Sequence, residues 1–219
     1  MIRLDLPLVG PAVSVLETAR ALATRHQSVA ILLHGDPGVG KSHLLDLLAL
    51  EMTGSPFAIE RVNGQSLGID LVREWRDRAG CGNLFSARTV KRIDELDESS
   101  SSARAELLTY LDYLPAGMMV LATTNNYGRL RAESKGRLET RFKTLRVDAP
   151  SIQDARHYLR KQFRVPVGAA LAIAQGAVPD GCLASEGVNM RACVEDAEAF
   201  AAASLTLRRH ERGAESEAA

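Results

Sequence analysis

One short stretch limits what this chain can fold into more than any other. Residues 35–42 read GDPGVGKS, which matches the phosphate-binding loop pattern GxxxxGK(S/T) at every fixed position. An apolar run at 29–33 comes before the loop, and a second apolar run at 44–48 comes after it. A strand, a glycine-rich loop and a helix in this order are the context that the pattern needs. The stretch therefore predicts an α/β fold that binds a nucleoside triphosphate.

The residue types in the loop suit a phosphate and a metal ion. Gly38 and Gly40 lack a Cβ atom, so the backbone can curl around an anion with its N–H groups turned inward, and Pro37 stiffens the curve. The N-terminus of the next helix adds partial positive charge. Lys41 can reach the β- and γ-phosphates, and the Ser42 hydroxyl can ligate Mg²⁺. The alternative is a glycine turn that matches the pattern by chance. It would not explain why the loop, the lysine, the hydroxyl and the flanking elements all fit the same site.

The rest of the chain alternates strands with helices. Further strand-like apolar runs are predicted at 57–62, 89–93, 118–122 and 142–147, and amphipathic helical stripes separate them. We therefore expect a parallel five-stranded sheet flanked by helices, followed by a small α-helical domain. The break at residues 148–150 divides the chain into a nucleotide-binding core, 1–149, and a helical domain, 150–208. Residues 209–219 are charged or small, and we expect a disordered tail there.

Composition excludes several classes of protein. Lys plus Arg and Asp plus Glu both total 27, so the net charge is zero and indicates no nucleic-acid binding, although a local basic patch is compatible with it. Cys81, Cys182 and Cys193 show no CxxC spacing, which favours reduced thiols in a cytoplasmic protein and no zinc site. No apolar run approaches membrane-spanning length, and the N-terminus does not resemble a signal peptide.

Acidic residues follow the third predicted strand. Asp94 and Glu95 come directly after it, where an Asp can hold the water shell of Mg²⁺ and a Glu can orient the attacking water. Lys91 and Arg92 fit this interpretation poorly, because such a strand lies inside the sheet and is usually apolar. The alternative is a solvated run of charges, but the position after a good phosphate loop favours a catalytic pair.

Amides follow the fourth predicted strand. Open α/β sheets bind ligands at the carboxyl ends of their strands, which is where Asn125 and Asn126 would lie. Either side chain could bind the γ-phosphate or the lytic water, and an asparagine-rich turn is the simpler interpretation. A basic segment, 127–141, comes next. Trp75 lies on a helical stripe and is predicted to pack rather than to stack on a base.

In this order, the features resemble an AAA+ ATPase over about residues 8–207, and most closely the small subunits of clamp loaders. Residues 63–73 are similar to the segment after the second strand in those subunits, and Thr140-Arg141-Phe142 resembles their Ser-Arg-Cys motif. Two features depart from that pattern. No collar domain follows the helical domain, and Lys91 and Arg92 interrupt the apolar strand.

The resemblance implies roles for individual residues. Asp94 and Ser42 would hold Mg²⁺, Glu95 and Asn125 would act on the attacking water and the γ-phosphate, Arg141 would be the arginine finger with Arg137 as a substitute, and Arg191 would be sensor 2. Simpler interpretations are a surface pair of Arg141 with Glu139 or Asp148, and of Arg191 with Glu195. The residues expected to contact ATP are Leu8, Val9, Gly35, Asp36, Pro37, Gly38, Val39, Gly40, Lys41, Ser42 and His43.

The resemblance also implies a function. We expect ATP hydrolysis at a site shared between subunits of a homo-oligomeric ring or spiral, with Arg141 inserted by the neighbour. The first hypothesis is a clamp-loader-like or helicase-loader-like switch in DNA replication, recombination or a mobile element, acting with DNA and a protein partner. Arg73, Arg76 and Arg78 are candidate DNA contacts.

Three other functions are weighed against this one. A protein-remodelling chaperone usually has an aromatic pore loop, which the sequence Leu67-Gly68-Ile69 lacks. An ATP-bound scaffold would not need the water-activating Glu95. A small-molecule kinase would not need the additional asparagine and arginines.

Overall fold

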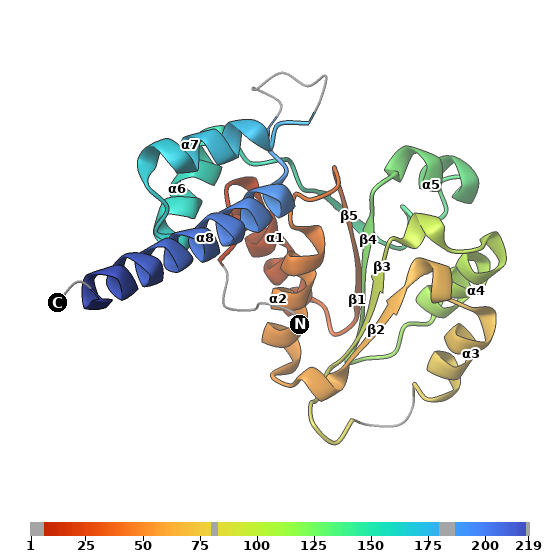
Figure 1. The fold of residues 1–219 in the computed structure, drawn as a ribbon. Coiled ribbons are helices and arrows are strands. Elements are labelled where there is room, and N and C mark those ends of the chain that lie inside the picture. Colours follow the sequence, from red (N-terminus) through yellow and green to blue (C-terminus); the bar gives the residue numbers. More distant parts are fainter. Residues whose placement is uncertain (1–6, 80–82, 180–186, 218–219) are drawn as a thin grey trace. The chain divides into compact units, whose positions relative to one another are not determined.

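A computed structural model describes residues 7–79, 83–179 and 187–217, with residues 205–217 described as backbone only (Figure 1). The chain divides into two units, Met1–Asp148 and Ala149–Ala219. The first unit contains the predicted sheet and phosphate loop, and the second contains only helices among its described residues.

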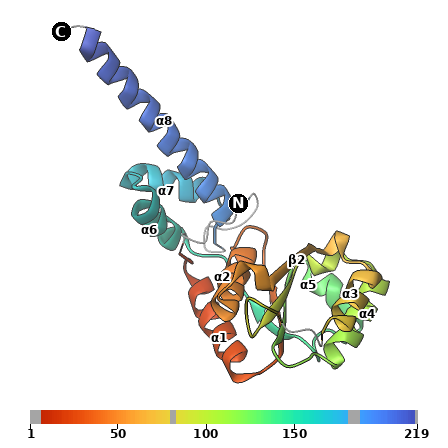
Figure 2. The same ribbon diagram turned by 90° about the horizontal axis from the view of Figure 1, so that it is seen from below.

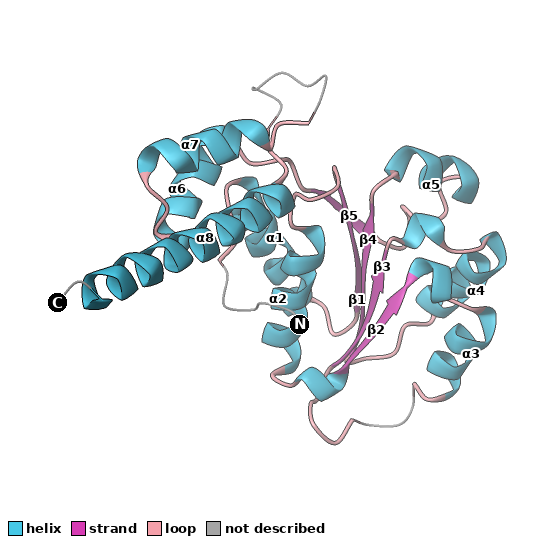
Figure 3. Cartoon of the chain, in the orientation of Figure 1, coloured by secondary structure: helices cyan, strands magenta, loops and turns pink. Residues whose placement is uncertain are grey.

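Five parallel strands form the sheet, in the order β2-β3-β4-β1-β5 (Figure 3). Their bounds are β1 Val29–His34, β2 Ile59–Asn63, β3 Thr89–Asp94, β4 Met118–Thr124 and β5 Lys143–Arg146. The predicted five-stranded parallel sheet is therefore confirmed. Because β1 lies between β4 and β5, both of its edges are paired, and the loop that follows it leaves from an interior strand of the sheet.

Helices cover both faces of the sheet. Figures 1 and 2 show α1 and α2 on one face, and α3, α4 and α5 on the other. Their bounds are α1 Pro11–Arg25, α2 Lys41–Thr53, α3 Ile69–Asp77, α4 Ser101–Asp112 and α5 Tyr127–Ser134. Short 3₁₀ turns occur at η1 Pro56–Ala58, η2 Gly64–Ser66 and η3 Leu96–Glu98. Most of the apolar residues on the predicted helical stripes are buried, but Val13 on α1 is 44% exposed.

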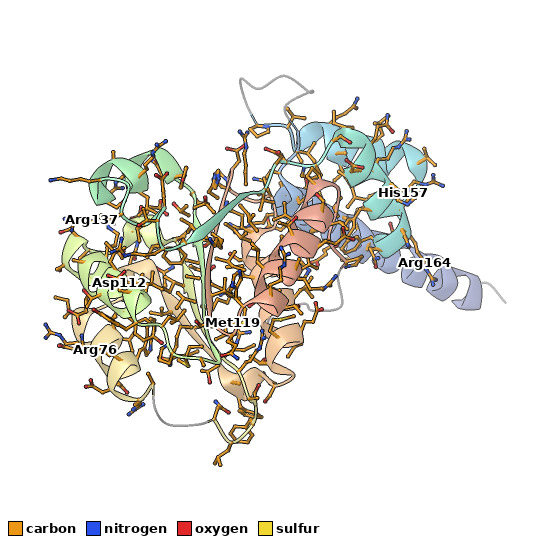
Figure 4. The ribbon with its side chains drawn as sticks, turned by 180° about the vertical axis from the view of Figure 1, so that it is seen from behind. Arg76, Asp112, Met119, Arg137, His157 and Arg164 are labelled. Carbon is orange, nitrogen blue, oxygen red and sulfur yellow. The ribbon has the colours of Figure 1, made fainter. Side chains whose placement is uncertain are left out.

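The core lies between the helices and the sheet. Met119, the second residue of β4, is completely buried (Figure 4). On the face covered by α3 and α4, the rings of Trp75 and Tyr110 pack with centroids 6.2 Å apart. The indole Nε1 of Trp75 donates to Glu60 Oε1 over 2.7 Å. Because the side chain is buried, neither face of the ring is available for a nucleotide base. The packing role predicted for Trp75 is confirmed.

Strand β3 is buried although it carries two cations. Lys91 is 8% exposed and Arg92 is 4% exposed. Lys91 Nζ lies 2.5 Å from Glu60 Oε2 and 5.3 Å from the centre of the Trp75 ring. A buried cation is tolerated only where a counter-charge is close, and each of these two has one. The expectation of an almost wholly apolar strand is therefore wrong here.

The second unit is a small helical domain made by α6 Ile152–Phe163, α7 Val167–Gly176 and α8 Met190–Glu217. A capping box begins α6, where the side chains of Ser151 and Asp154 each accept a hydrogen bond from the backbone N–H of the other residue. Helix α8 continues through the stretch expected to be a disordered tail. The Ala, Glu and Arg residues of that stretch favour helix, which is the physical reason for the difference.

Two of the three cysteines, Cys81 and Cys182, lie outside the described residues. Cys193 is buried in the second unit, and burial raises the pKa of its thiol to about 11. Within the described ranges, no helix is long and apolar enough to cross a membrane. The same part of the chain holds no group of three His, Cys, Asp or Glu side chains suited to a metal ion.

Candidate functional site

The phosphate loop connects β1 to α2 and requires glycine for two different reasons. A Cβ atom on Gly35 would lie 2.2 Å from the carbonyl oxygen of Val147, so only glycine fits beneath the segment after β5. Gly40 has open space around it, but its φ of +97° is a left-handed conformation that favours glycine. Gly38 has a φ of +82°, which also favours glycine. The result is a tight curve whose end is the N-terminus of α2.

Hydrogen-bond donors gather inside this curve. Lys41 is 6% exposed, and its Nζ donates to the carbonyl oxygens of Gly35 and Asp36 over 2.8 Å and 2.7 Å. None of the described side chains caps the N-terminus of α2. The ammonium group and the first N–H groups of the helix thus face the same space, which is the arrangement that an oligophosphate needs.

A hydroxyl and a carboxylate meet beside the loop. Ser42 Oγ donates to Asp94 Oδ1 over 2.8 Å, across the gap between α2 and the carboxyl end of β3. Thr123, on β4, donates to the same oxygen over 3.3 Å. A serine hydroxyl and an aspartate are oxygen ligands of the kind that Mg²⁺ prefers when phosphates complete its shell. These residues therefore fit a nucleotide-bound magnesium ion.

Glu95 is held in place by its neighbours. Its φ of +54° is unusual for a residue other than glycine, and its N–H donates to Thr123 Oγ1 over 3.0 Å. Two amides then donate to its carboxylate: Asn125 Nδ2 over 3.2 Å, and Asn63 Nδ2 over 3.4 Å. A Cβ atom on Gly64 would lie 2.0 Å from the carbonyl oxygen of Glu95. The carboxylate therefore has a defined position at the edge of the sheet.

The two asparagines after β4 have different tasks. Asn126 Oδ1 accepts the N–H of Arg129 over 3.0 Å and caps α5, whereas the Asn125 amide faces Glu95. Asn63 was not assigned a role at the site by the sequence analysis. The signal was its place at the end of β2, where it is in register with Asp94.

Arg92 adds a cation to this group. Its Nη1 donates to Asp94 Oδ2, and its Nη2 donates to the carbonyl oxygen of Ser42 over 3.1 Å. Its Nε lies 3.0 Å from Oδ1 of Asp46 on α2 but does not meet hydrogen-bond geometry with it. Arg61 Nε lies 3.3 Å from the same oxygen of Asp46. Arg92 and Asp46 thus form a buried pair at the centre of a cluster of two carboxylates and two guanidinium groups, in which Asp94 is partly exposed and Arg61 is exposed.

Arg141 lies at the amino ends of the strands, whereas the phosphate loop lies at their carboxyl ends. It precedes β5, whose first residue, Lys143, is in register with Ile31, whereas the loop begins after His34. At roughly 3.3 Å per strand residue, Arg141 is about 20 Å along the sheet from Gly35. Its side chain therefore has no access to the phosphate loop of the same chain.

The partner of Arg141 is Asp112, at the end of α4 (Figure 4). Arg141 Nε donates to Oδ1 over 2.7 Å and Nη2 donates to Oδ2 over 3.0 Å. This ion pair lines a cavity of about 250 Å³ together with His26 and Lys143. The alternative pairs of Arg141 with Glu139 or Asp148 do not occur among the described residues, where those carboxylates pair with Arg131 and Arg146.

The remaining predicted residues take varied places. Leu8 and Val9 are half-buried in the segment before α1, and Arg137 is exposed near Arg141. Arg191 is exposed in the first turn of α8, and no ion pair with Glu195 occurs among the described side chains. The other loop residues lie between β1 and α2 or start α2: Asp36 and Pro37 are exposed, Val39 is buried, and His43 is half-buried.

The three candidate DNA-contacting arginines are neutralised by carboxylates. Arg73 and Arg76 lie 3.7 Å and 3.0 Å from Glu106 Oε1, and Arg78 lies 2.6 Å from Glu74 Oε1. All three are exposed on α3. An arginine that already has a carboxylate partner contributes less to an electrostatic attraction for phosphates, so this helix presents no free basic surface.

A ring stack joins the end of β1 to α5. His34 and Tyr127 stack with centroids 4.3 Å apart and ring planes 16° from parallel, and the Tyr127 hydroxyl donates to Glu139. Burial lowers the pKa of His34, and the nearby charge of Arg146 adds to this effect. His34 is therefore neutral near neutral pH.

One protein-family model matches this chain. The model is described as the ATPase family associated with various cellular activities (AAA), and it matches residues 31–145. These residues begin in β1 and end in β5, so they include the phosphate loop, Asp94, Glu95, Asn125 and Arg141. No curated protein matches the chain.

Two solved structures from Thermotoga maritima have a similar fold. One is a DNA polymerase III gamma subunit-related protein, with a TM-score of 0.57 and 16% identity, covering 72% of this chain and 56% of that one. The other is the Holliday junction branch migration motor RuvB, with a TM-score of 0.60 and 20% identity, covering 87% of this chain and 61% of that one. This chain spans less than two thirds of either protein, and at these identities the likeness is one of fold.

Proposed function

This chain belongs to the ATPase family associated with various cellular activities, and from this we propose that it binds ATP with Mg²⁺ and hydrolyses it. The observation that supports the proposal is that three groups of residues lie together at the carboxyl ends of the strands. Lys41 covers the loop, Ser42 and Asp94 share a hydrogen bond, and Glu95 stands beside them between two amides.

Each of these residues has a task in the proposed reaction. The ammonium group of Lys41 exchanges its loop carbonyls for phosphate oxygens, and Ser42 and Asp94 hold the metal ion with its water shell. The bound Mg²⁺ supplies charge neutralisation at the phosphates. Glu95 accepts the proton of the attacking water, while Asn125 fixes the position of that carboxylate and contacts the γ-phosphate. Asn63 holds the other carboxylate oxygen of Glu95.

We further propose that the active site is completed by a second subunit. Arg141 lies about 20 Å along the sheet from its own loop, so it can act only on the nucleotide of a neighbour in a ring or spiral. Arg137 is exposed in the same segment and is the substitute (Figure 4). An arginine supplied in this way contributes about 10³- to 10⁵-fold to the rate. The contact of Arg191 with the nucleotide is likewise a proposal.

The proposed task is a clamp-loader-like or helicase-loader-like switch that acts on DNA with a protein partner. The names of the two similar structures, a DNA polymerase III gamma subunit-related protein and a branch migration motor, support this choice. The burial of Leu67, which is 3% exposed, argues against a remodelling chaperone, because this side chain packs in the core and is not available to grip a polypeptide. Because α3 carries no free basic surface, the DNA contact is expected elsewhere.

The test is the steady-state ATPase rate per subunit, measured over a range of protein concentrations with single-stranded DNA, double-stranded DNA or neither. We expect a rate that rises with protein concentration, because the site is shared, and rises again with DNA. A low rate that does not depend on concentration or DNA contradicts both the shared site and the DNA task. Stimulation by unfolded protein in place of DNA would favour the remodelling chaperone.

A further inference from the structure

Arg92 occupies a place in β3 that brings it to the proposed metal site. Alternate residues of a strand face the same side of the sheet, so Arg92 and Asp94 both face α2. The side chain of Arg92 is 4% exposed, which excludes it from direct contact with bulk solvent. Its charge therefore acts on the residues around it.

The contacts of Arg92 include both residues proposed to hold Mg²⁺. Nη1 donates to the Asp94 carboxylate, and Nη2 donates to the main-chain oxygen of Ser42 over 3.1 Å. The hydroxyl of Ser42 donates in turn to the other oxygen of Asp94. One guanidinium group thus fixes the distance between the serine and the aspartate.

The charge of Arg92 is divided between two carboxylates. Asp46, whose side chain is 5% exposed, lies 3.0 Å from Arg92 Nε and 3.3 Å from Arg61 Nε. Arg61 contacts Asp46, and neither Asp94 nor Ser42 is among its ion-pair or hydrogen-bond partners in the described part of the chain. Asp46 therefore determines how much of the charge of Arg92 is left for Asp94.

We propose that Arg92 is a positioning residue that lowers the affinity of the nucleotide site for Mg²⁺, and that Asp46 limits this effect. The proposal rests on the proposed function, since it assumes that ATP and Mg²⁺ bind at the loop. A guanidinium group that is hydrogen-bonded to Asp94 offsets the negative charge that attracts the metal ion, and the burial of that guanidinium group limits screening by water. Outer-shell partners of metal ligands typically change metal affinity 10- to 100-fold, and their loss usually lowers it. Because the partner here is a cation, we expect its removal to raise the affinity.

The experiment measures metal affinity rather than turnover. A fluorescent ATP analogue is bound to the protein in the presence of EDTA, and free Mg²⁺ is then titrated to find the concentration that half-saturates the gain in nucleotide affinity. The test variant is Arg92→Met with Asp46→Asn, which removes the cation without leaving a buried carboxylate unpaired. We expect the half-saturating Mg²⁺ concentration to fall at least tenfold below that of the wild type.

The matched control is Arg61→Met with Asp46→Asn. It has the same net charge as the test variant and loses the same carboxylate, but it keeps Arg92 on Asp94. We expect its half-saturating Mg²⁺ concentration to stay at or above the wild-type value. If Arg92 contributed to stability alone, the two variants would have the same half-saturating Mg²⁺ concentration.

The single variant Asp46→Asn keeps the inference testable if the double variant does not fold. It leaves the whole charge of Arg92 to Asp94, so the half-saturating Mg²⁺ concentration is expected to rise above the wild-type value. An unchanged or lower value overturns the inference, as does a test variant whose metal affinity does not increase. If the wild type binds no ATP analogue, the proposed function itself fails, whereas nucleotide binding with the same metal dependence in all variants overturns only the role of Arg92.

Discussion

At the scale of single residues, Glu95 is fixed by contacts from both neighbouring strands. The amide of Asn63 comes from the end of β2, and the Thr123 hydroxyl and the Asn125 amide come from β4 and the residue after it. A general base works only within hydrogen-bond reach of its proton, so a fixed carboxylate is worth more than one on a mobile side chain.

Glu95→Gln tests the role of this carboxylate. A glutamine keeps the shape but accepts a proton poorly, so we expect the ATPase rate to fall by about 10²- to 10⁴-fold while ATP affinity changes little. Steady-state turnover and equilibrium binding of a fluorescent ATP analogue measure the two quantities. Glu98→Gln is the control, because Glu98 is exposed in η3, and it should leave both unchanged. A Glu95→Gln protein with near-normal turnover would rule Glu95 out as the base.

Gly64→Ala tests the packing that supports Glu95. The added Cβ would lie 2.0 Å from the carbonyl oxygen of Glu95, so we expect a loss of about 1–3 kcal/mol in the free energy of unfolding. Urea denaturation measures it. In Gly68→Ala the new Cβ meets no atom within 4 Å, so the loss should be clearly smaller. Equal losses in the two variants would show that the contact at Gly64 relaxes without cost.

At the scale of elements, the end of β1 is joined to α5 through the stacked rings of His34 and Tyr127. This stack connects the residue before the phosphate loop to the helix after Asn125. Because it buries a titratable ring, it also makes the folded state sensitive to acid.

The stability of the protein should fall as the pH drops below the ordinary pKa of histidine. Burial holds the pKa of His34 below 6.5 in the folded protein, so the unfolded chain binds the proton more strongly and gains stability from it. His34→Phe keeps a ring that cannot titrate. Between pH 7.5 and 5.5, urea denaturation should show a smaller loss of unfolding free energy for this variant than for the wild type.

The control for this pH effect is His157→Gln, since His157 is exposed on α6 (Figure 4). It should follow the wild-type pH dependence. If His34→Phe loses as much stability as the wild type over the same range, the proton is taken up elsewhere.

Sequence patterns predicted the elements better than the contacts between them. Apolar runs located the buried strands β1 and β4 most clearly, since a buried parallel strand is usually apolar, whereas β3 is buried although it carries Lys91 and Arg92. The motif and the resemblance predicted the places of Ser42, Asp94 and Glu95, because they depend on strand ends. They did not predict the partners of Arg92 and Arg141, because neither periodicity nor a motif tells which carboxylate lies opposite a charged side chain in three dimensions.

At the scale of the whole molecule, the place of Arg141 predicts that active sites form between subunits. Proteins with Arg141→Ala and with Glu95→Gln should each be nearly inactive alone. When they are mixed, some sites combine the intact Glu95 of one subunit with the intact Arg141 of the next. We expect the mixture to regain ATPase activity well above the average of its two components.

The control for this mixture is Arg141→Ala protein combined with the double variant, Arg141→Ala with Glu95→Gln. No pairing of these subunits supplies an intact arginine, so no activity should return. A mixture of the two single variants that stays at the average of its components would mean that Arg141 acts within its own subunit or has no role in hydrolysis.

The order of the strands also bears on how the chain folds as it leaves the ribosome. β1 is made first, yet its two neighbours in the sheet are β4 and β5, which are made last. Until Met118 and the residues after it have emerged, β1 exposes two unpaired edges, and β2 is not its neighbour. The phosphate loop is therefore synthesised long before β4 and β5, the strands that hold it in place. The sheet of the first unit can form completely only after these two strands have been made.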